Sequence, residues 1–537
     1  MPPLSYIELF AGCGGMSLGL DSTGMTRLFS NELSPMAAET YAYNLLGIDL
    51  AASSFRALPD HRRKVRWLES RYDPQHIQRR LQENPLEFSE QPRRDEEVSA
   101  SGLSGSLIVG DIRSLNRYEQ DKGALLGDVA VDVVSGGPPC QSFSMAGLRQ
   151  YGNQRNRLPW EFANFVERHN PRLVVLENVS GIMRPFTNED GEKVHVWFEV
   201  AKAFAAKGYA PLCLHVNAVR VGVAQNRPRF LMFAVRKDEL GAVCRRLGGD
   251  AWVMELGSRL LDDGGSSGFE ASNPLHKVLD LAAARIDPRL EGSILAKYFR
   301  SVDDFVSVGE AIDDLAGMRW AGPGDYSKNL SAELGGYVKA PGVRISGAQP
   351  QNNQHREHTP KVQSRFRLYQ IVDALASSGV PSQEAAARAI FERVKMKTAV
   401  QPSREALESA LALSSSGLPM LNAQGREVKG IEEARGVLCE LETHKHTQRA
   451  LRRNRPAPAA LSIPDDACHY CLPRTLSVRE TARIQSFPDE FVFRSQPTTG
   501  GYRRKFQVPQ YTQVGNAVPP RLARHIGGFM GQLLNEA

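Results

Sequence analysis

Short apolar runs alternate with helix-like stretches from residue 5 to residue 236, and this alternation restricts the possible folds more than any other feature of the sequence. Residues 35–46 and 194–207 carry apolar side chains at helical spacing, and Pro35 lies at the start of the first stretch, where a helix tolerates proline. Strands that alternate with helices are typical of βα units around a mostly parallel sheet. We therefore predict an α/β fold with strands at 6–10, 27–31, 106–109, 131–135, 173–176, 211–217 and 229–235.

The alternation stops after residue 236. A Gly/Ser-rich stretch at 262–268 indicates a linker, and helices are predicted at 384–395 and 404–413. An amphipathic stretch at 521–534 is again typical of a helix that packs on a sheet. We predict a first domain at 1–236 with a basic insertion at about 56–104, a second domain at 237–495, and a C-terminal segment at 496–537 that returns to the first domain.

The composition is that of a soluble globular protein, with 42% hydrophobic and 23% charged residues in a chain of 537. No apolar run approaches the length that crosses a bilayer, and the first residues lack the basic and apolar regions of a signal peptide. We therefore expect a cytoplasmic protein. The 7 cysteines are scattered, which favours thiols over a disulfide framework.

Basic residues are clustered although the net charge is only +6. Such clusters neutralise phosphates in proteins that bind nucleic acid, but they also occur as ordinary solvated faces. Taken together they suggest a nucleic-acid partner. The clusters lie at 56–80, at Lys445, Arg449, Arg452, Arg453 and Arg455, and at Arg503, Arg504 and Lys505.

The first predicted strand ends in a glycine-rich turn at 10–15, with the sequence Phe-Ala-Gly-Cys-Gly-Gly. Such a turn lets a ligand approach the backbone, although it can also be merely a tight connection between strand and helix. Glu32 ends the second strand, where a doubly wound fold places an acid against ribose hydroxyls. Asp111 follows the third strand and could accept from an adenine amino group. Together these groups predict a cofactor that contains a nucleoside.

A loop with two glycines and two prolines follows the fourth predicted strand at 136–144 and presents Cys140. Free cysteine is usually a small buried hydrophobe, but core packing does not need so rigid a loop, and we interpret Cys140 as a functional thiol. Glu177 follows the next strand, and Arg227 and Arg229 precede the last one. A thiol, a carboxylate and two guanidinium groups are therefore expected in one crevice.

These motifs resemble those of the DNA (cytosine-5)-methyltransferases of the bacterial, restriction-modification type. The turn at 10–15 is similar to the family's cofactor-binding motif, and 136–144 to its catalytic Pro-Cys loop. Residues 177–179 match its Glu-Asn-Val motif and 225–229 its Gln-x-Arg-x-Arg motif. The last two family motifs have counterparts, in the expected order, at 476–488 and 513–520.

The resemblance implies a Rossmann-like methyltransferase sheet, S-adenosyl-L-methionine as cofactor, and a target-recognition domain after residue 236. It implies catalytic roles for Cys140, Glu177, Arg227 and Arg229. The implied substrate-binding residues are Gln141, Ser142, Ser144, Asn178 and Gln225. The implied cofactor-binding residues are Phe10, Gly12, Gly14, Gly15, Glu32, Asp111, Ile112, Pro138, Leu158, Asn516 and Val518.

The chemistry of the family explains these residue types. Cytosine C5 is a poor nucleophile, so a thiolate, here Cys140, first adds to C6 of the base. Glu177 would bind the N3 and amino edge of a base that has been flipped out of the duplex. Gly147 and Gly152 bracket a segment that would act as a lid over this site, unless it is an ordinary surface loop.

The resemblance implies double-stranded DNA as partner, a separately encoded restriction endonuclease as a further one, and a monomer that associates with the nucleoid. An RNA cytosine-5 methyltransferase and a catalytically silent DNA-binding regulator are the alternative functions. Cys468 and Cys471 have the spacing of half a zinc site, but a second such pair is missing, and we predict no metal.

Overall fold

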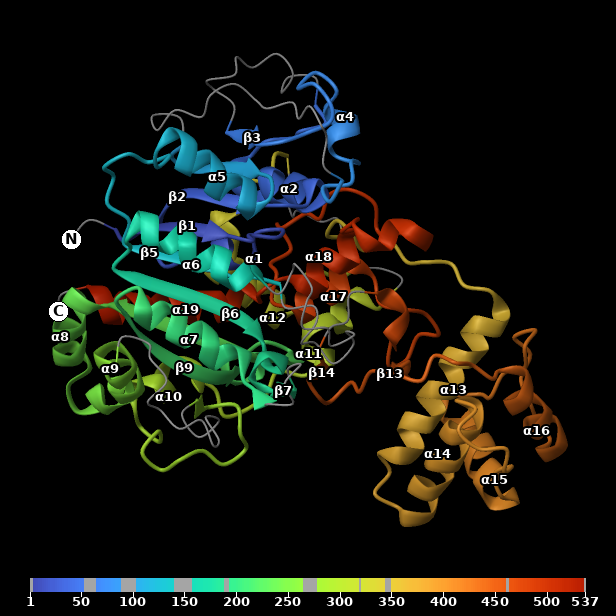
Figure 1. The fold of residues 1–537 in the computed structure, drawn as a ribbon. Helices are drawn as coiled ribbons and strands as arrows, with labels where there is room; N and C mark the ends of the chain where they lie inside the picture. The colour runs from blue at the N-terminus through green and yellow to red at the C-terminus, as the bar shows by residue number, and fades with distance from the viewer. Residues whose placement is uncertain are drawn as a thin grey trace.

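A nine-stranded sheet forms the centre of the molecule (Figure 1), in a computed structural model that describes residues 3–52, 64–87, 103–139, 157–187, 193–263, 278–317, 320–342, 349–459 and 463–535. The strand order is β12-β9-β11-β6-β5-β1-β2-β4-β3, and β11 alone among these strands runs antiparallel to its neighbours. The predicted α/β class with a mostly parallel sheet is thus confirmed. The strands are β1 (Ser5–Leu9), β2 (Thr26–Glu32), β3 (Val65–Trp67), β4 (Ser106–Val109), β5 (Val133–Gly136), β6 (Leu173–Val179), β9 (Tyr209–Asn217), β11 (Pro228–Arg236) and β12 (Leu279–Asp280).

Parallel pairing brings the carboxyl ends of the central strands to one edge of the sheet. Leu9 at the end of β1 is level with Asn31 in β2 and with Gly136 in β5, and Gly136 is level with Leu176 in β6. The loops that follow these strands therefore start side by side. This edge is where an open α/β sheet binds its ligand.

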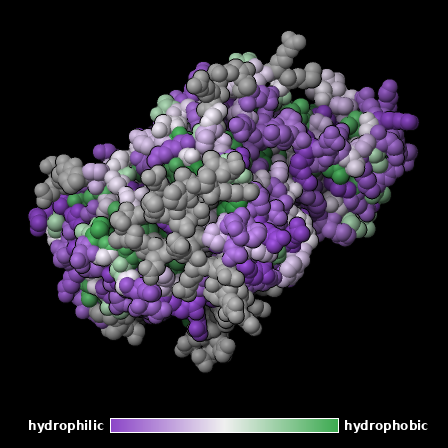
Figure 2. Space-filling model, turned by 90° about the horizontal axis from the view of Figure 1, so that it is seen from above, coloured by the Kyte–Doolittle hydropathy of each residue, from purple (hydrophilic) through white to green (hydrophobic). Residues whose placement is uncertain are grey.

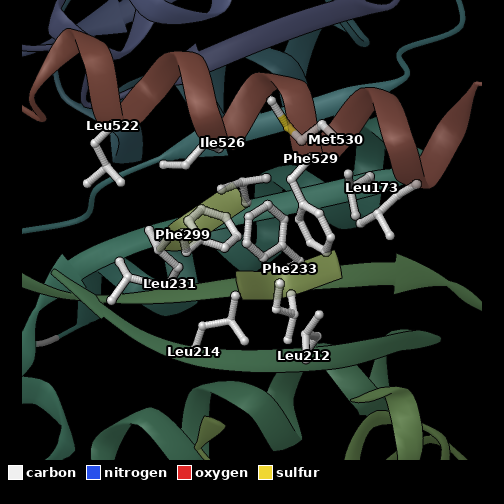
Figure 3. Close-up of a cluster of buried hydrophobic side chains, with 14 of the residues drawn as sticks. Leu173, Leu212, Leu214, Leu231, Phe233, Phe299, Leu522, Ile526, Phe529 and Met530 are labelled. Carbon is white, nitrogen blue, oxygen red and sulfur yellow. The ribbon is translucent and has the colours of Figure 1, made fainter. Parts of the chain in front are cut away.

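Helices cover both faces of the sheet, which explains why its strands are continuous apolar runs. On one face, α19 (Pro520–Leu534) lies across the strands (Figure 3), and the rings of Phe529 and Phe233 meet edge to face at 4.9 Å. The opposite face is covered by α5 (Ile112–Lys122), α6 (Leu158–His169) and α7 (Val196–Ala206). Each face of the sheet thus has its own hydrophobic core, and we call the one under α19 the first core. It joins the two ends of the chain, because α1 (Gly15–Asp21) packs on the same face as α19.

The segment after residue 236 differs from the sequence prediction in its packing. We predicted that a second domain starts at 237, but α8 (Lys237–Leu247), α9 (Glu255–Asp262) and α10 (Ile294–Phe299) add side chains such as Val243, Leu260 and Phe299 to the two cores of the sheet. β12 is even a strand of that sheet. A change in sequence rhythm does not reveal which core an amphipathic helix will join.

Residues 360–441 form a group of helices with a hydrophobic core of its own, which we call the helical module. Figure 1 shows it in orange, projecting from the main body. Its core includes Phe366, Ile390, Leu407 and Leu438. The module consists of α13 (Pro360–Ala376), α14 (Pro381–Val394), α15 (Arg404–Ala412) and α16 (Ile431–Glu440), and two of these match the predicted helices at 384–395 and 404–413.

A third core connects the first helices to elements from the last third of the chain. Within it, α17 (Val478–Ile484) starts with a capping box in which Ser477 and Glu480 bind each other's backbone amides. The buried guanidinium of Arg483 pairs with Asp489 at 2.7 Å. The chain's remaining helices and strands, within this core or outside it, include α2 (Pro35–Tyr41), a π-helix (Ala42–Leu46), α4 (Ile77–Arg80), α11 (Val308–Ile312), α12 (Asp325–Leu334), α18 (Gln510–Asn516), and the short strands β7 (Phe186–Thr187), β8 (Lys193–Val194), β10 (Gln225–Asn226), β13 (Arg449–Ala450), β14 (Ala457–Pro458) and β15 (Ala467–Cys468).

The described residues on the face seen from above in Figure 2 are mainly hydrophilic, with apolar ones scattered between them. The elements thus turn their apolar faces inward, as a globular fold requires. Among the helices that the structure describes, none combines the length and the apolar character of a membrane-spanning segment.

Candidate active site

A cavity of about 810 Å³ lies at the carboxyl edge of the sheet. Residues from β1, β2, β4, β5 and β6 reach it from their strand ends, and the segment around α18 closes it from the far end of the chain. Of the predicted site residues within the described part of the chain, Phe10, Gly12, Glu32, Asp111, Ile112, Pro138, Leu158, Glu177, Asn178, Arg227, Arg229, Asn516 and Val518 line it.

The glycine-rich turn after β1 shapes one end of this cavity. Gly12 has a φ of +56°, a conformation that favours glycine, and its amide donates to the Glu32 carboxylate at 2.8 Å. Gly14 and Gly15 do not line the cavity. A Cβ on Gly15 would lie 2.3 Å from the carbonyl oxygen of Val518, so this glycine instead lets α1 approach the C-terminal segment.

Glu32 is held by backbone amides on both carboxylate oxygens. Gly12 donates to Oε2 at 2.8 Å and Ser34 donates to Oε1 at 2.7 Å. Burial raises the pKa of Glu32, and these two hydrogen bonds partly oppose the rise. Each carboxylate oxygen retains acceptor capacity, so Glu32 can still receive hydroxyl donors from the cavity.

Asp111 performs a structural task as well as lining the cavity. It caps the start of α5 by accepting from the Arg113 amide at 2.8 Å, and its carboxylate also pairs with the Arg113 guanidinium at 2.6 Å. The side chain of Asn31 holds the preceding turn, because it donates to the Gly110 carbonyl at 3.0 Å. Asp111 and Ile112 are therefore fixed at the cavity wall.

The opposite end of the cavity contains a buried ion pair. Arg229 Nε lies 2.7 Å from Glu177 Oε1, and the side chains are only 9% and 11% exposed. Gly137 makes room for this carboxylate, because a Cβ there would lie 3.1 Å from Glu177 Oε2. Asn178 donates from Nδ2 to the Pro138 carbonyl at 2.8 Å, which ties the end of β6 to the loop after β5.

Arg227 binds the C-terminal segment. One terminal nitrogen donates to the carbonyls of Gly515 and Ala517 at 2.7 and 3.0 Å, and the other donates to Gln225 at 3.3 Å. The side chain is fully buried, and this burial lowers the pKa of Arg227. Arg227 therefore closes the cavity, while Gln225 lies behind it, in β10, and does not line the cavity.

Part of the predicted site lies outside the residues that the structure describes. Pro139 lines the cavity as the last described residue before this part. The predicted lid at 147–152 lies outside the described residues. Cys140, Gln141, Ser142 and Ser144 lie outside them as well.

The cavity also has walls that the sequence motifs did not predict. One of these walls is Leu33, the residue after Glu32. Two others are Lys505, from the third basic cluster, and its neighbour Phe506. Pro85 and Leu86 come from the predicted insertion. An Asn-Pro pair at 84–85 signals a turn, but the sequence holds no signal for what that turn contacts.

The basic cluster at 445–455 is largely paired with acids. Lys445 lies 2.9 Å from Asp465 and Arg452 lies 2.7 Å from Asp373. Arg453 pairs with Asp313. Much of this charge is therefore neutralised within the chain.

Cys468 and Cys471, which have the spacing of half a zinc site, are free cysteines. Cys468 is buried, which raises its pKa, and Cys471 is exposed. Over the described residues, no three His, Cys, Asp or Glu side chains are grouped so that they could hold a metal ion.

Comparisons with known proteins add independent information. The model of the C-5 cytosine-specific DNA methylase family matches residues 4–56, 103–245 and 347–532. The type II methyltransferase M.DdeI of Desulfomicrobium norvegicum is 24% identical over 530 residues, which cover 97% of this chain and 87% of that protein.

Two further relatives differ in how much of the chain they match. The DNA (cytosine-5-)-methyltransferase M.ApeKI of Aeropyrum pernix is 24% identical over 579 residues, which cover 100% of both chains. The type II methyltransferase M1.HphI of Haemophilus parahaemolyticus is 32% identical over 238 residues, which cover 44% of this chain and 46% of that protein. The match to the family model covers β1, β2, β4, β5, β6, β11 and α18, which contribute residues to the cavity wall or to the turns beside it.

Proposed function

The chain belongs to the C-5 cytosine-specific DNA methylase family, and we propose that it transfers a methyl group from S-adenosyl-L-methionine to carbon 5 of a cytosine within a specific double-stranded DNA sequence. The observation that carries this proposal is the single cavity that Glu32 and Asp111 line at one end and Glu177 and Arg229 line at the other. One space thus offers groups for a nucleoside and groups for a base.

The first end of the cavity fits the adenosyl part of the cofactor. Glu32 offers acceptor capacity for ribose hydroxyls, and Gly12 presents backbone without a side chain. Phe10 and Ile112 add apolar walls for a purine. The cofactor, when bound, supplies a methyl group on a sulfonium centre.

Cys140 is our proposed nucleophile. Its thiolate adds to C6 of the cytosine while N3 gains a proton, and the electron pair released into the ring makes C5 nucleophilic. C5 then takes the methyl group, which leaves S-adenosyl-L-homocysteine. Loss of the C5 proton, followed by loss of the N3 proton as Cys140 is expelled, re-forms the double bond between C5 and C6, which leaves neutral 5-methylcytosine and regenerates the thiolate.

The described residues would support this reaction by position and charge. Glu177 would hydrogen-bond the N3 and amino edge of the base, and Arg229 holds this carboxylate through the 2.7 Å ion pair. Asn178 fixes the backbone two residues before Cys140 through the Pro138 carbonyl. Because a stacked base hides C6, the target cytosine must leave the duplex, at a cost of a few kcal/mol.

We propose that DNA is contacted by the region after β11. The target-recognition region at 237–475 would include the helical module, which projects from the main body in Figure 1. The type II names of the relatives support a role in restriction-modification. We propose that the enzyme acts in the cytoplasm, with a separately encoded endonuclease as partner. We propose that the enzyme acts as a monomer.

Base-resolution sequencing of 5-methylcytosine tests the proposal directly. The wild-type chain, expressed in a host without cytosine methylation, should methylate one fixed short sequence, and Cys140→Ser should leave the same DNA unmethylated. Methylation of tRNA but not DNA would favour an RNA enzyme instead. Sequence-specific DNA binding without any methylation would favour a silent regulator.

A further inference from the structure

The predicted insertion contributes to the wall of the cofactor cavity. Pro85 and Leu86 line this cavity together with Asp111, yet they lie outside the match to the family model, which stops at residue 56 and resumes at 103. This wall is thus an addition to the pattern that the family model describes.

A strand at the edge of the sheet anchors the insertion beside the cofactor end. β3 pairs in parallel with β4, with Trp67 level with Val109, and the Leu68 amide donates to the Val109 carbonyl at 2.9 Å. Leu68 then packs on the turn that leads to Asp111, since a Cβ on Gly110 would lie 2.9 Å from the Leu68 Cβ. The insertion and the turn before Asp111 are therefore in direct contact.

The chain then folds back over this strand. Glu83 accepts from the Ser70 hydroxyl at 2.9 Å and from the Arg71 amide at 3.2 Å. The Arg80 guanidinium lies over the Trp67 ring at 5.3 Å from its centre. Arg71 also forms an ion pair with Glu87 at 2.7 Å. These contacts fix both ends of the segment from Glu83 to Glu87.

A tight turn within this segment presents Leu86 to the cavity. The Asn84 side chain accepts a hydrogen bond from the Leu86 amide at 3.1 Å, which makes an Asx turn. It also donates a hydrogen bond to the Glu87 carboxylate at 2.9 Å. Leu86 is half-buried and lines the cavity. Pro85 also lines a second, small pocket of about 40 Å³, together with Trp67.

We propose that residues 84–87 enclose the nucleobase end of the bound cofactor, with Leu86 as an apolar contact to the purine beside Asp111. This inference rests on the proposed function, because it assigns a wall to the cofactor named there. An apolar side chain that is covered by a purine loses contact with water, and its removal weakens binding in proportion to the area uncovered. Leu86 is a positioning residue for the cofactor and not a catalytic residue.

Calorimetric titration of the full chain with S-adenosylhomocysteine, in the absence of DNA, tests this assignment. Leu86→Ala should raise the dissociation constant about tenfold, and Asn84→Ala should raise it less, because it loosens only the turn. Leu411→Ala serves as the matched control, since Leu411 is a half-buried leucine of the helical module outside the cavity, and it should leave the constant unchanged. Thermal unfolding of each variant verifies that it is folded.

A second ligand identifies which end of the cofactor Leu86 contacts. Sinefungin shares the adenosine part and differs at the position of the sulfur, so Leu86→Ala should weaken both ligands by the same factor. Equal affinity of wild type and Leu86→Ala, or a loss limited to one ligand, would overturn the proposal. If the wild-type chain itself binds neither ligand, the proposed cofactor is wrong, which is a different result from an intact wild type with an unaffected variant.

Discussion

Glu177 and Arg229 neutralise each other inside the cavity wall at 2.7 Å, with little access to solvent. Removing one member of such a buried pair leaves the other as an uncompensated charge in a medium of low polarity. In this site the pair is also directional, because Arg229 approaches one oxygen of Glu177 and the Gly137 backbone lies against the other. Each residue thus depends on its neighbour for orientation.

Arg229→Ala is therefore expected to lower kcat by about 100-fold or more, a magnitude typical of losing one preorganised electrostatic contact. S-adenosylhomocysteine affinity should change less than about twofold, because the cofactor residues lie at the other end of the cavity. Single-turnover methylation and calorimetry separate the two effects. Arg229→Lys should recover part of the rate, since it restores the charge without the planar fork of arginine. Equal rates for the wild type and Arg229→Ala would show that the pair has no role in the reaction.

Glu8 is a buried carboxyl on β1 that also reaches the cavity. Burial raises the pKa of Glu8 to about 8, although a hydrogen bond from Ser17 lowers it. The folded state therefore holds this proton where the unfolded chain, with a pKa near 4.5, has lost it. This group's contribution to stability is complete below about pH 4.5 and declines as the pH rises to about 8.

Glu8→Gln should remove that dependence. We expect the variant to gain stability relative to wild type as the pH rises, by about 2–4 kcal/mol between pH 5 and pH 8, because glutamine stays uncharged. Urea unfolding at both pH values measures the difference. If the difference in free energy of unfolding between the two proteins is the same at both pH values, Glu8 does not hold a proton in the folded state.

At the scale of elements, α1 and α19 pack closely because small residues lie between them. A Cβ on Gly19 would lie 2.4 Å from both the Ala523 Cβ and the Pro520 carbonyl oxygen. This contact joins the first helix of the chain to the last one and holds α19 on the sheet (Figure 3). A larger side chain must separate the two helices.

Gly19→Val is expected to destabilise the fold by about 1–3 kcal/mol, the usual cost of overpacking. Gly241→Ala is the matched control, because Gly241 lies in α8 and a Cβ there would have its nearest neighbour at 3.7 Å. Alanine at this exposed helical position should be neutral or stabilise by up to about 1 kcal/mol. Thermal unfolding of both variants gives the comparison, and similar shifts in Tm would disprove the close contact.

Sequence patterns predict the elements of the sheet well for a physical reason. A strand buried on both faces needs apolar residues throughout, as 173–176 and 230–235 show, so a run of them indicates β6 and β11 directly. β3 was not predicted, because its three residues include the buried Arg66 and lie within a basic stretch whose sequence resembles a surface loop. The boundary at 237 differs because amphipathic helices look alike whichever core they join.

In the candidate site, too, sequence patterns predict some residues, whereas others reach the cavity only through tertiary contacts. Glu32 and Glu177 lie in the last residues of β2 and β6, and Asp111 follows β4, so parallel pairing of neighbouring strands brings them to one edge and the sequence sufficed to group them. Leu86 reaches the cavity only through the pairing of β3 and the turn at Asn84, which no local pattern encodes. Arg227 lines the cavity, and its contacts with Gly515 and Ala517 depend on the tertiary fold.

On the scale of the whole molecule, the last helix is part of the first core. α19 buries apolar side chains of Leu522, Ile526, Phe529, Met530 and Leu533 against the sheet. At about 1.5–3 kcal/mol for each fully buried side chain, their loss is comparable with the usual net stability of a domain, about 5–15 kcal/mol.

A chain truncated after Pro519 should therefore aggregate or show no cooperative unfolding transition, although it retains every strand of the sheet. A chain that ends at Asn535 should unfold like the wild type, because α19 is intact. Circular dichroism melting and size-exclusion chromatography measure both. A cooperative transition in the shorter chain would show that the sheet is stable without α19.

The contacts of Arg227 with Gly515 and Ala517 also have a meaning for protein synthesis. A ribosome makes the two sides of the cavity several hundred residues apart, so the side that contains Gly515 and Ala517 is made long after the thiol loop and the acidic residues. A nascent chain that has not yet reached Gly515 would thus carry the thiol loop and the acidic residues without a closed pocket.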